Sequence, residues 1–437
     1  MSIDATTSPY RPVPDTQVTH PDWSRSATIY QLNQRHFTAE GTFRAAEAHL
    51  PRLRALGVDI LWLMPVNTIG ERNRKGPLGS PYAVKDYYAV NPEFGTVDDL
   101  KHFVDLAHDL GLHVILDWVA NHTAWDNVLV TEHPEWYARD WKGDLRPTPW
   151  WDWDDIIDLD YAHEGLRAYM TAAMVHWVRE VGIDGYRCDV AGFVPVDFWE
   201  QVRRELDEVK PVFLLAEWEA RDLHTRAFDA TYAWSWNETM HRLAHGKADL
   251  DALKAYYAWN DRAYQRDAYR MTFVSNHDKN AWEGTEYEQF GGALDAAIVL
   301  SVVGEGVPLI YNGQEAGSDK RLEFFTKDEI TWRDDPQGEL YRSLFALKKA
   351  HRALWNGAAG GRMVRIGNTE EASVLSFFRQ QDGDLVLAAF NLSPDPVTVT
   401  LAEHPPAPAG TDALTGAEVD LDATLTLGPW DWLVVAG

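Results

Sequence analysis

The sequence predicts an α/β protein of the (β/α)8 TIM-barrel class, with a short inserted domain after the third strand and a C-terminal antiparallel β-sandwich domain. Three observations support this fold class. From about residue 27 to residue 357, short apolar runs alternate with longer segments of helical period, a pattern typical of parallel βα units. One connection, 122–161, is longer than most connectors and is rich in Trp, Pro and Asp. After about residue 358 the helical period is replaced by short alternating runs between Gly, Asp and Pro turns, which is typical of an antiparallel β domain.

Eight apolar runs are candidates for the barrel strands. The intervening segments 42–57 and 96–111 carry apolar residues at helical spacing. The second of these helices is expected to begin after the N-cap Thr96 and to end at Gly111. Eight βα units close into a barrel whose chemistry lies where strands end and loops begin. In chain order, with the sixth the weakest, the expected strands are 27–33, 58–66, 112–120, 182–189, 212–217, 227–233, 271–277 and 307–312.

These boundaries divide the chain into segments. We expect an N-terminal extension at 1–24, a barrel formed by 25–121 and 162–357, an inserted subdomain at 122–161 and the β-sandwich domain at 358–437. The insertion is expected to extend over the mouth of the barrel. The strands expected in the last domain are 372–380, 384–392, 396–401 and 430–437.

The composition limits the partners and the location. The chain has 437 residues, of which 45% are hydrophobic and 12% aromatic, enough for a large core. Its formal charge of −27 argues against nucleic acid and anionic membrane surfaces as partners, because both select for basic patches. The single cysteine excludes an internal disulfide, and no apolar run approaches the roughly 20 residues that span a bilayer. The start of the chain lacks the pattern of a secretory signal, so we expect a cytoplasmic protein; the oligomeric state stays unknown.

Polar residues stand at the ends of four of the predicted strands. In an eight-stranded barrel such residues meet around one pocket even when they are distant in sequence. Three of them, Asp189, Glu217 and Asp278, are carboxylates that would face the pocket. In strand order the full set is Asp117, Asn121 and His122, then Arg187 and Asp189, then Glu217, and finally His277 and Asp278.

The segment "GYRCD" at 185–189 predicts the direction of two of these side chains. Strand alternation places Arg187 and Asp189 on one side of the strand and Cys188 on the other. A cation and a carboxylate that point the same way are costly in a core and useful in a pocket. We therefore expect Arg187 and Asp189 to face the pocket and Cys188 to be an inert residue between barrel and helices.

Paired carboxylates suit glycoside chemistry, in which one attacks or stabilises the anomeric carbon and the other protonates the leaving oxygen. Arg187 is expected to keep Asp189 ionised, which makes Asp189 the nucleophile. Glu217 follows an apolar strand and precedes Trp218, surroundings that would raise the pKa of Glu217 and make it the general acid. Asp278 is placed to hold ring hydroxyls and to stabilise the oxocarbenium-like charge.

Each of these residues also has a simpler interpretation. A single Asp at a strand end is most often a cap or turn residue, and an Arg–Asp pair is usually an ordinary ion pair. Polar clusters on four strand ends of one barrel are much harder to explain by coincidence. The convergence therefore favours a catalytic role over a structural one.

At these residues the sequence resembles the α-amylase superfamily of retaining glycoside hydrolases and transglycosylases, over roughly residues 25–437. The first and second motifs of that superfamily are similar to "DWVANH" at 117–122 and "GYRCD" at 185–189. The third and fourth are similar to Glu217 in "LLAEW" and to "VSNHD" at 274–278.

The resemblance implies a role for each site residue. It implies that Asp189 is the nucleophile, Glu217 the acid/base and Asp278 the stabiliser of the transition state. It also implies a substrate-binding set in which Tyr82 stacks on the ring under attack and Asp117 supports the site. The other members of that set are His122, Arg187 and His277.

The sequence departs from the superfamily on the side of the leaving group. Many starch-cleaving members carry Lys-His three and four residues after the nucleophile, where this chain has Gly192 and Phe193. The contact with the leaving-group sugar is therefore expected to be more apolar, with Phe193 and Trp218 as sugar platforms, which argues against efficient action on long starch. The short stretch "IIDLD" at 156–160 is similar to a fifth motif in the form associated with α-1,4-acting amylases. The other aromatic residues near the mouth are expected to pack the insertion: Trp118, Trp150, Trp151 and Trp153.

Structural calcium is one of two interpretations of a further pair of residues. Asn121 and Asp158 match positions that supply oxygen ligands to calcium in many relatives, and calcium requires hard oxygen donors. The alternative for Asn121 is a hydrogen bond that fixes a loop. No organic cofactor is expected.

We therefore expect an enzyme that cleaves α-1,4-glucosidic bonds of short maltooligosaccharides with retention, through a covalent glycosyl-enzyme intermediate. Transfer to another sugar shares that intermediate, so the motifs do not separate transglycosylation from hydrolysis. An α-glucosidase, or a sucrose- or maltose-active transglycosylase or isomerase of the same superfamily, is the enzymatic alternative. An inactive scaffold or sugar-binding barrel is disfavoured, because inactive relatives usually lose at least one of the carboxylates.

Overall fold

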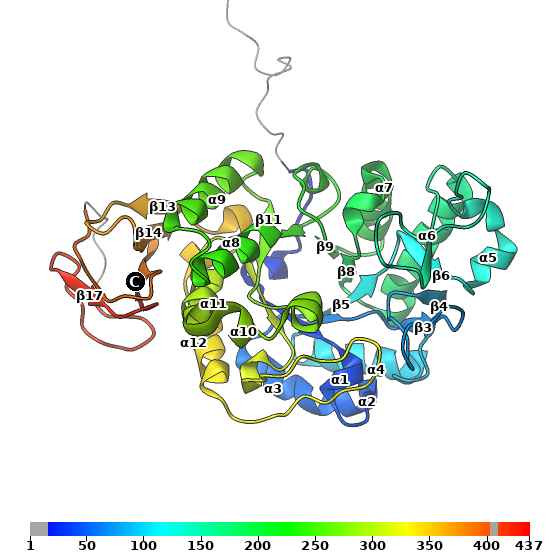
Figure 1. Ribbon diagram of the computed structural model, residues 1–437, viewed down its shortest axis with the longest axis horizontal. Helices are drawn as coiled ribbons and strands as arrows, with labels where there is room; N and C mark the ends of the chain where they lie inside the picture. The colour runs from blue at the N-terminus through cyan, green and yellow to red at the C-terminus, as the bar shows by residue number, and fades with distance from the viewer. Residues whose placement is uncertain (1–15, 403–409) are drawn as a thin grey trace, which may run out of the picture.

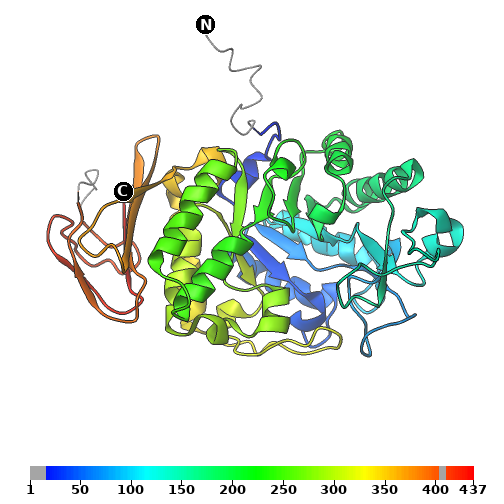
Figure 2. The same cartoon turned by 45° about the horizontal axis from the view of Figure 1, so that its top comes forward.

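The computed structural model describes residues 16–402 and 410–437. It has three parts (Figure 1): a central barrel, an insertion on one side of it around α5 and β6, and a β domain at the opposite end, where β17 lies. Figure 2, in which the molecule is turned, shows the barrel between the other two parts again. Residues 1–15 of the expected N-terminal extension and 403–409 of the last domain lie outside the described residues.

Eight parallel strands form a closed barrel, which confirms the predicted fold class. β1 pairs with a strand on each side, through Ile29 and Ile60 and through Ile29 and Leu309. Because all the strands are parallel, their carboxyl ends meet at one rim. In order around the barrel the strands are β1 (Ile29–Leu32), β12 (Val307–Tyr311), β11 (Tyr269–Thr272), β10 (Ala230–Tyr232), β9 (Phe213–Ala216), β8 (Gly185–Cys188), β5 (His113–Trp118) and β2 (Ile60–Leu63).

Side chains along the strands alternate between the barrel interior and the layer beneath the helices. Ile115 and Leu215 belong to the cluster that fills the interior, whereas Tyr186 and Cys188 belong to the cluster between strands and helices. Cys188 is fully buried in that layer, as the sequence predicts. The side chain of Arg187 is therefore directed into the barrel, towards the rim.

Helices cover the outside of the barrel. Between β9 and β10 the chain has only the 3-10 turn Asp222–His224, so one of the eight expected βα units lacks an α-helix. The helix expected at 42–57 is divided by the 3-10 turn Glu47–His49, and Pro51 lies in the first turn of the second part, where its missing N–H costs nothing. The helices are α1 (Gln34–Phe37), α2 (Phe43–Ala46), α3 (Leu50–Leu56), α4 (Val97–Asp109), α6 (Glu164–His176), α7 (Val196–Asp207), α8 (Trp234–Ala244), α9 (Leu250–Ala263), α10 (Glu286–Phe290), α11 (Leu294–Val303) and α12 (Pro336–Ala350).

The ends of α4 follow the predicted cap chemistry. The Thr96 hydroxyl accepts a hydrogen bond from the N–H of Asp99 at 3.1 Å, and the Asp99 carboxylate accepts one from the N–H of Thr96 at 2.9 Å. This reciprocal pair is a capping box. Gly111, just after the helix, has a φ of 73°, a left-handed conformation that glycine adopts without strain.

The bounds of the strand expected at 271–277 are wrong. β11 pairs with β12 only at Met271 and Thr272, and the chain then leaves the barrel wall. The side chain of Asn276 caps the turn that follows, because it accepts a hydrogen bond from the N–H of Lys279 at 2.8 Å. His277 and Asp278 therefore lie beyond the strand, at the start of the helical segment that continues as Lys279–Glu283, over the mouth of the barrel.

Two connections on the rim carry small antiparallel sheets. The insertion contains β6 (His122–Ala124), α5 (Val128–Glu132) and β7 (Ile156–Asp158), with β6 and β7 paired. The connection between β2 and α4 is a second excursion that the sequence does not predict. It contains β3 (Asn67–Ile69) and β4 (Val84–Val90).

The C-terminal domain has two layers of antiparallel strands. One face of its four-stranded sheet, which includes Phe377, joins the main core of the protein. The other face, which includes Val374 and Leu387, packs against the two-stranded sheet at Val399. The strands are β13 (Met363–Ile366), β14 (Val374–Gln381), β15 (Asp384–Asn391), β16 (Val397–Val399), β17 (Leu425–Leu427) and β18 (Trp432–Ala436).

Residues 16–24 pack on the barrel near the amino ends of its strands. Nδ1 of His20 lies 2.6 Å from Oδ1 of Asp229, and both side chains are fully buried. Trp23 stacks on His113 with ring centroids 3.8 Å apart. Among the residues described, no helix combines the length and the apolar character that crossing a membrane requires.

Candidate active site

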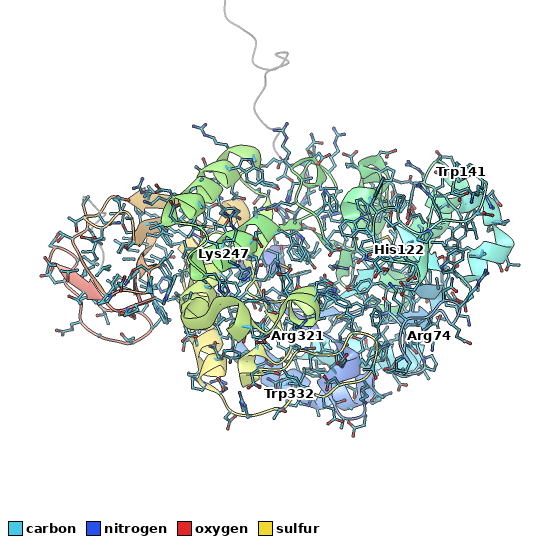
Figure 3. The ribbon with its side chains drawn as sticks, in the orientation of Figure 1. Arg74, His122, Trp141, Lys247, Arg321 and Trp332 are labelled. Atoms are coloured by element: carbon cyan, nitrogen blue, oxygen red, sulfur yellow. The ribbon has the colours of Figure 1, made fainter. Side chains whose placement is uncertain are left out.

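A cavity of about 670 Å³ opens at the carboxyl ends of the barrel strands, a volume typical of small-molecule sites. Asp189, Glu217 and Asp278 all line it. His122, also in the lining, lies between the barrel and the insertion in Figure 3, whereas Trp141 lies at the outer end of the insertion, away from the cavity. The other predicted residues that line the cavity are Tyr82, Phe193, Trp218 and His277.

Arg187 holds the acidic residues together from behind. Its Nη1 donates hydrogen bonds to Oδ1 of Asp189 at 2.9 Å and to Oδ1 of Asp117 at 2.7 Å. Its Nη2 lies 3.0 Å from Oε2 of Glu217, an ion-pair contact without hydrogen-bond alignment. Its Nε donates to the hydroxyl of Tyr232 at 3.1 Å. A single, fully buried guanidinium thus contacts three carboxylates.

Asp117 accepts further hydrogen bonds beneath the cavity. Its Oδ2 accepts from the hydroxyl of Tyr82 at 3.0 Å and from the indole N–H of Trp62 at 3.2 Å. Neither Asp117 nor Arg187 lines the cavity: Asp117 supports Tyr82 and Arg187 contacts the candidate nucleophile Asp189, as expected, and a contact of either with the sugar itself stays a prediction. Both residues lie beneath the cavity because their side chains come from within the strands rather than from the loops.

His277 is oriented by Gln31 of β1. The carboxamide oxygen of Gln31 accepts a hydrogen bond from the backbone N–H of His277 at 3.2 Å, so its amino group donates to Nδ1 of the ring at 2.7 Å. The ring proton then lies on Nε2, which is 2.7 Å from the hydroxyl oxygen of Tyr82 and 3.3 Å from Oδ2 of Asp278. The sequence contains no local signal for Gln31, because it lies 246 residues from its partner.

Val190 connects the nucleophile candidate with Glu217. It directly follows Asp189, and its backbone N–H donates to Oε2 of Glu217 at 2.7 Å. Its φ of 34° and ψ of 47° lie in the left-handed region, which costs a β-branched residue on the order of 1–2 kcal/mol. Backbone strain at this position therefore accompanies the contact between the two loops.

Burial raises the pKa of each of the four carboxyl groups. It raises the pKa of Asp117 and of Asp278 to about 6, against the opposing charge of Arg187. It also raises the pKa of Glu217, as the sequence predicts. Arg187 lowers the pKa of Asp189, in the expected direction, but burial and the Glu217 carboxylate outweigh it, so that the pKa of Asp189 is raised. One cation among four carboxyl groups favours a cluster that retains a proton near neutral pH.

Both histidines of the site are neutral. Burial lowers the pKa of His122 and of His277 to about 3, below the range in which the carboxyl groups titrate. Nε2 of His122 lies 3.9 Å from Oδ2 of Asp189. The two rings are therefore hydrogen-bonding groups at the cavity wall rather than cations.

Phe193 and Trp218 lie together at the cavity, as the sequence predicts. Their ring centroids are 5.1 Å apart and their planes are tilted by 57°. Gly192 allows this arrangement, because a Cβ at that position would lie 2.1 Å from Cε2 of the Trp218 indole. Gly192 therefore makes room for an aromatic surface.

Two tryptophans that the sequence assigns to packing line the cavity instead. Trp151 and Trp153 stack with ring centroids 5.0 Å apart and an interplanar angle of 19°. Of the other two, Trp118 is buried in the core, whereas Trp150 is fully exposed and does not pack the insertion as expected. The sequence signal was available, since an aromatic cluster sits in the long loop after a barrel strand.

A second aromatic group lines the other side of the cavity and was not predicted. Phe324 and Phe325 follow β12, and Trp282 follows β11. The ring of Trp282 lies 5.2 Å from that of Phe324 and 5.9 Å from that of Phe325, measured between centroids.

The contacts of Asn121 and Asp158 do not fit a calcium site. Oδ1 of Asp158 accepts hydrogen bonds from the side-chain amide of Asn121 at 3.4 Å and from the hydroxyl of Thr148. Burial raises the pKa of Asp158, and the nearby charge of Arg146 opposes that shift. Calcium requires several oxygen ligands rather than donors and a cation. In the part of the chain that the structure describes, no three His, Cys, Asp or Glu side chains are grouped to hold a metal ion.

Comparison with known proteins matches this chain to one protein family and to similar solved structures. The family model of the alpha-amylase catalytic domain matches residues 24–346. The crystal structure of an alpha-amylase from Lactobacillus plantarum superimposes with a TM-score of 0.85 at 31% sequence identity, and the match covers 95% of this chain and 99% of that one.

Two curated relatives are longer than this chain. Alpha-amylase MalA of Haloarcula japonica is 27% identical over 433 residues, a match that covers 93% of this chain and 61% of the relative. An alpha-1,4-glucan:maltose-1-phosphate maltosyltransferase of Myxococcus xanthus is 33% identical over 419 residues, covering 85% of this chain and 60% of the relative. The chain therefore spans less than two thirds of the length of either.

Proposed function

The chain belongs to the alpha-amylase family, and on this basis we propose that it is a retaining glycoside hydrolase that cleaves α-1,4-glucosidic bonds of maltooligosaccharides. The observation that carries the proposal is the meeting of Asp189, Glu217 and Asp278 in one cavity. Asp189 and Glu217 also contact the same guanidinium, that of Arg187. This shared contact favours the short separation of retaining enzymes, about 5–5.5 Å, over the about 6.5–9.5 Å of inverting enzymes.

In the first step, a carboxylate oxygen of Asp189 attacks the anomeric carbon of the bound sugar. The bond between that carbon and the glycosidic oxygen breaks, and the carboxyl group of Glu217 gives its proton to the leaving oxygen. A covalent glycosyl ester on Asp189 results. The raised pKa of Glu217 supports this assignment, because it extends the pH range in which the proton is available.

In the second step, Glu217, now ionised, removes a proton from water while the water oxygen attacks the anomeric carbon. The ester bond breaks and Asp189 is restored as a carboxylate, so two inversions give net retention. A hydroxyl of another sugar in place of water gives transglycosylation. The name of the Myxococcus relative, a maltosyltransferase, keeps transfer open for this chain.

The remaining lining residues are assigned to the sugar under attack. Asp278 is placed to hold ring hydroxyls and to stabilise positive charge at the anomeric carbon. Tyr82 offers its ring face to the sugar and His122 its neutral Nε2, whereas both ring nitrogens of His277 contact Gln31 and Tyr82. Phe193 and Trp218 form the platform for the leaving group, because Trp218 directly follows the general acid.

The proposal is tested with maltotriose. We expect turnover in which the newly formed reducing end first appears as the α anomer, as followed by proton NMR, because double displacement retains configuration. Chromatography of the same reaction separates the two outcomes: products longer than maltotriose indicate transfer, and only shorter products indicate hydrolysis. Initial β anomer, or no turnover of any α-1,4-linked substrate, contradicts the proposal.

The alternatives predict other substrates. An α-glucosidase, or a sucrose- or maltose-active transglycosylase or isomerase, would turn over maltose or sucrose faster than maltotriose, so those sugars belong in the same panel. An inactive scaffold is disfavoured because all three carboxylates line one cavity and Arg187 contacts two of them, Asp189 and Glu217. A location in the cytoplasm stays a prediction.

We also propose that the insertion is held without calcium, by the hydrogen bonds that Asp158 accepts from Asn121 and Thr148. A chelator is therefore expected to leave the melting temperature and the activity unchanged. The measurement is calorimetry with and without EDTA, with elemental analysis of the untreated protein. A lower melting temperature in EDTA that added calcium restores would establish a calcium site instead.

A further inference from the structure

Residues from three different loops line one part of the cavity. Lys75 comes from the connection between β2 and α4, Asp155 from the insertion, and Phe324 and Phe325 from the loop after β12. All four line the cavity. These four residues are called the end wall below.

Lys75 joins the first loop to the insertion. Its Nζ lies 3.1 Å from Oδ1 of Asp154 and 3.6 Å from Oδ1 of Asp155, and it also donates to the backbone carbonyl of Asp152. Asp155 is buried, so one member of this contact is withdrawn from solvent. Lys75 therefore closes the space between the two loops with both charge and hydrogen bonds.

The same loop is joined to the loop after β12. The N–H of Leu78 donates to the carbonyl of Phe325 at 3.1 Å. Gly76 has a φ of 64°, and a Cβ there would lie 2.5 Å from Cβ of Phe325, so the two loops touch at this point. The buried guanidinium of Arg35 donates to the carbonyl oxygens of Gly79 at 3.1 Å and of Phe324 at 3.3 Å, which fixes both loops to the barrel.

The end wall lies across the barrel from the leaving-group platform. Two of its three loops follow β2 and β12, which flank β1, and the third, the insertion, follows β5; Phe193 and Trp218 follow β8 and β9, on the side of the ring opposite β1. Figure 3 marks the two wall loops by Arg74 and Arg321. Phe324 also stacks on Tyr82, with ring centroids 6.2 Å apart and an interplanar angle of 17°. The wall thus begins directly beside the residue assigned to the sugar under attack.

The chemistry of the reaction indicates which end of the substrate lies towards the end wall. The leaving group departs from the anomeric carbon on the side of Glu217, so the part of the substrate that extends the other way is its non-reducing end. With the leaving group at Phe193 and Trp218, the opposite end of the substrate chain is directed towards the end wall.

We propose that the end wall makes this protein act from the non-reducing end of linear α-1,4-linked oligosaccharides and release short products. This inference rests on the proposed function and adds the direction and the mode of action to it. It requires a substrate with a free non-reducing end, because a bulky group there meets Lys75 and Phe325.

The first test compares p-nitrophenyl maltoheptaoside with the same compound blocked by a 4,6-O-ethylidene group at its non-reducing end. We expect the blocked substrate to react at least about tenfold more slowly, because a closed pocket rejects added bulk by factors of this size or more. Early products of the free substrate should be one short sugar plus its complement. Equal rates, or early products of all lengths, would overturn the inference.

The second test opens the wall. Lys75→Ala removes the link to Asp154 and Asp155, and it should raise the ratio of blocked to free rates about two- to fivefold, in line with the loss of a partly exposed ion pair. Lys85→Ala is the matched control, since Lys85 pairs with Glu71 on the same connection and with Asp126 of the insertion, but outside the cavity. An unchanged ratio in Lys75→Ala, or an equal rise in both variants, counts against the wall.

The two proposals fail in different ways. If the protein cleaves blocked and free substrates equally well, only the direction of attack is wrong and the α-1,4 activity stands. If neither substrate is cleaved and maltotriose is also untouched, the proposed function fails first.

Discussion

Replacing Asp189 with Asn is expected to abolish turnover of α-1,4-linked oligosaccharides while the fold is kept. An amide oxygen is a poor nucleophile and does not form the glycosyl ester, so kcat should fall by about 10⁴-fold or more, as for other covalent nucleophiles. The Asn side chain keeps an oxygen that can accept the hydrogen bond from Nη1 of Arg187, now 2.9 Å from Oδ1 of Asp189. The contacts around position 189 therefore need little adjustment in the variant. The measurement is kcat on maltotriose, with oligosaccharide binding followed by calorimetry.

The stability of this variant has an expected pH dependence. Burial raises the pKa of Asp189 in the folded protein, so the ionised carboxylate costs folding free energy at pH values above its unfolded pKa. Asn removes that cost. The melting temperature of Asp189→Asn at pH 7 should thus equal or exceed that of the parent, and the difference should shrink as pH falls to about 4, near the unfolded pKa.

A matched control separates the role of Asp189 from the chemical change itself. Asp197→Asn makes the same substitution at an exposed position on α7, where the carboxylate pairs with Arg167. It should leave kcat unchanged. Substantial activity in Asp189→Asn, or an unfolded variant, would contradict the assignment of the nucleophile.

The barrel and the three carboxylates that line the cavity were accessible from the sequence because their signals are local. The alternation in "GYRCD" predicts the opposite directions of Arg187 and Cys188, since a strand has a period of two residues wherever it lies. The cap residues of α4 likewise act within one turn. The convergence at the rim then follows from closing a parallel barrel, which brings strand ends together without any further information.

The support of the site was not accessible, because it depends on pairs that are distant along the chain. Gln31 and His277 meet only after the barrel has closed, and neither residue type marks the pairing in advance. The same holds for Lys75 and Asp155, which come from two different excursions. The direction of the pKa shift of Asp189 also depends on burial and on Glu217, neither of which a motif measures.

Replacing Glu217 with Gln is expected to separate substrates by the quality of their leaving groups. A sugar leaving group needs the proton of Glu217, so kcat/KM on maltotriose should fall by about 10²–10⁴-fold. A 2,4-dinitrophenolate leaves without protonation, so kcat/KM on 2,4-dinitrophenyl maltoside should fall much less. The measurement is kcat/KM for both substrates, with Glu205→Gln, on the exposed side of α7, as the control with no expected effect on either.

The pH dependence of kcat/KM tests the role of Glu217 as the general acid independently. Burial raises the pKa of Glu217, so its proton is held to higher pH and is lost on the alkaline side. In the parent protein, kcat/KM on maltotriose should therefore fall as pH rises through that pKa. In Glu217→Gln, kcat/KM on the aryl maltoside should lack this alkaline fall, because the titrating group is gone.

The second step of the reaction, in which the glycosyl ester is hydrolysed, also tests the role of Glu217. Without Glu217 to remove a proton from water, the glycosyl ester on Asp189 should accumulate, so the aryl maltoside should give a rapid release of one equivalent of phenolate followed by slow turnover. Azide needs no proton removed, and it should restore turnover and give an α-glycosyl azide as the product of two inversions. Unequal losses, a burst and rescue by azide each require that the missing group transfers protons. Equal losses on both substrates, no burst and no effect of azide would therefore place the acid/base on another residue.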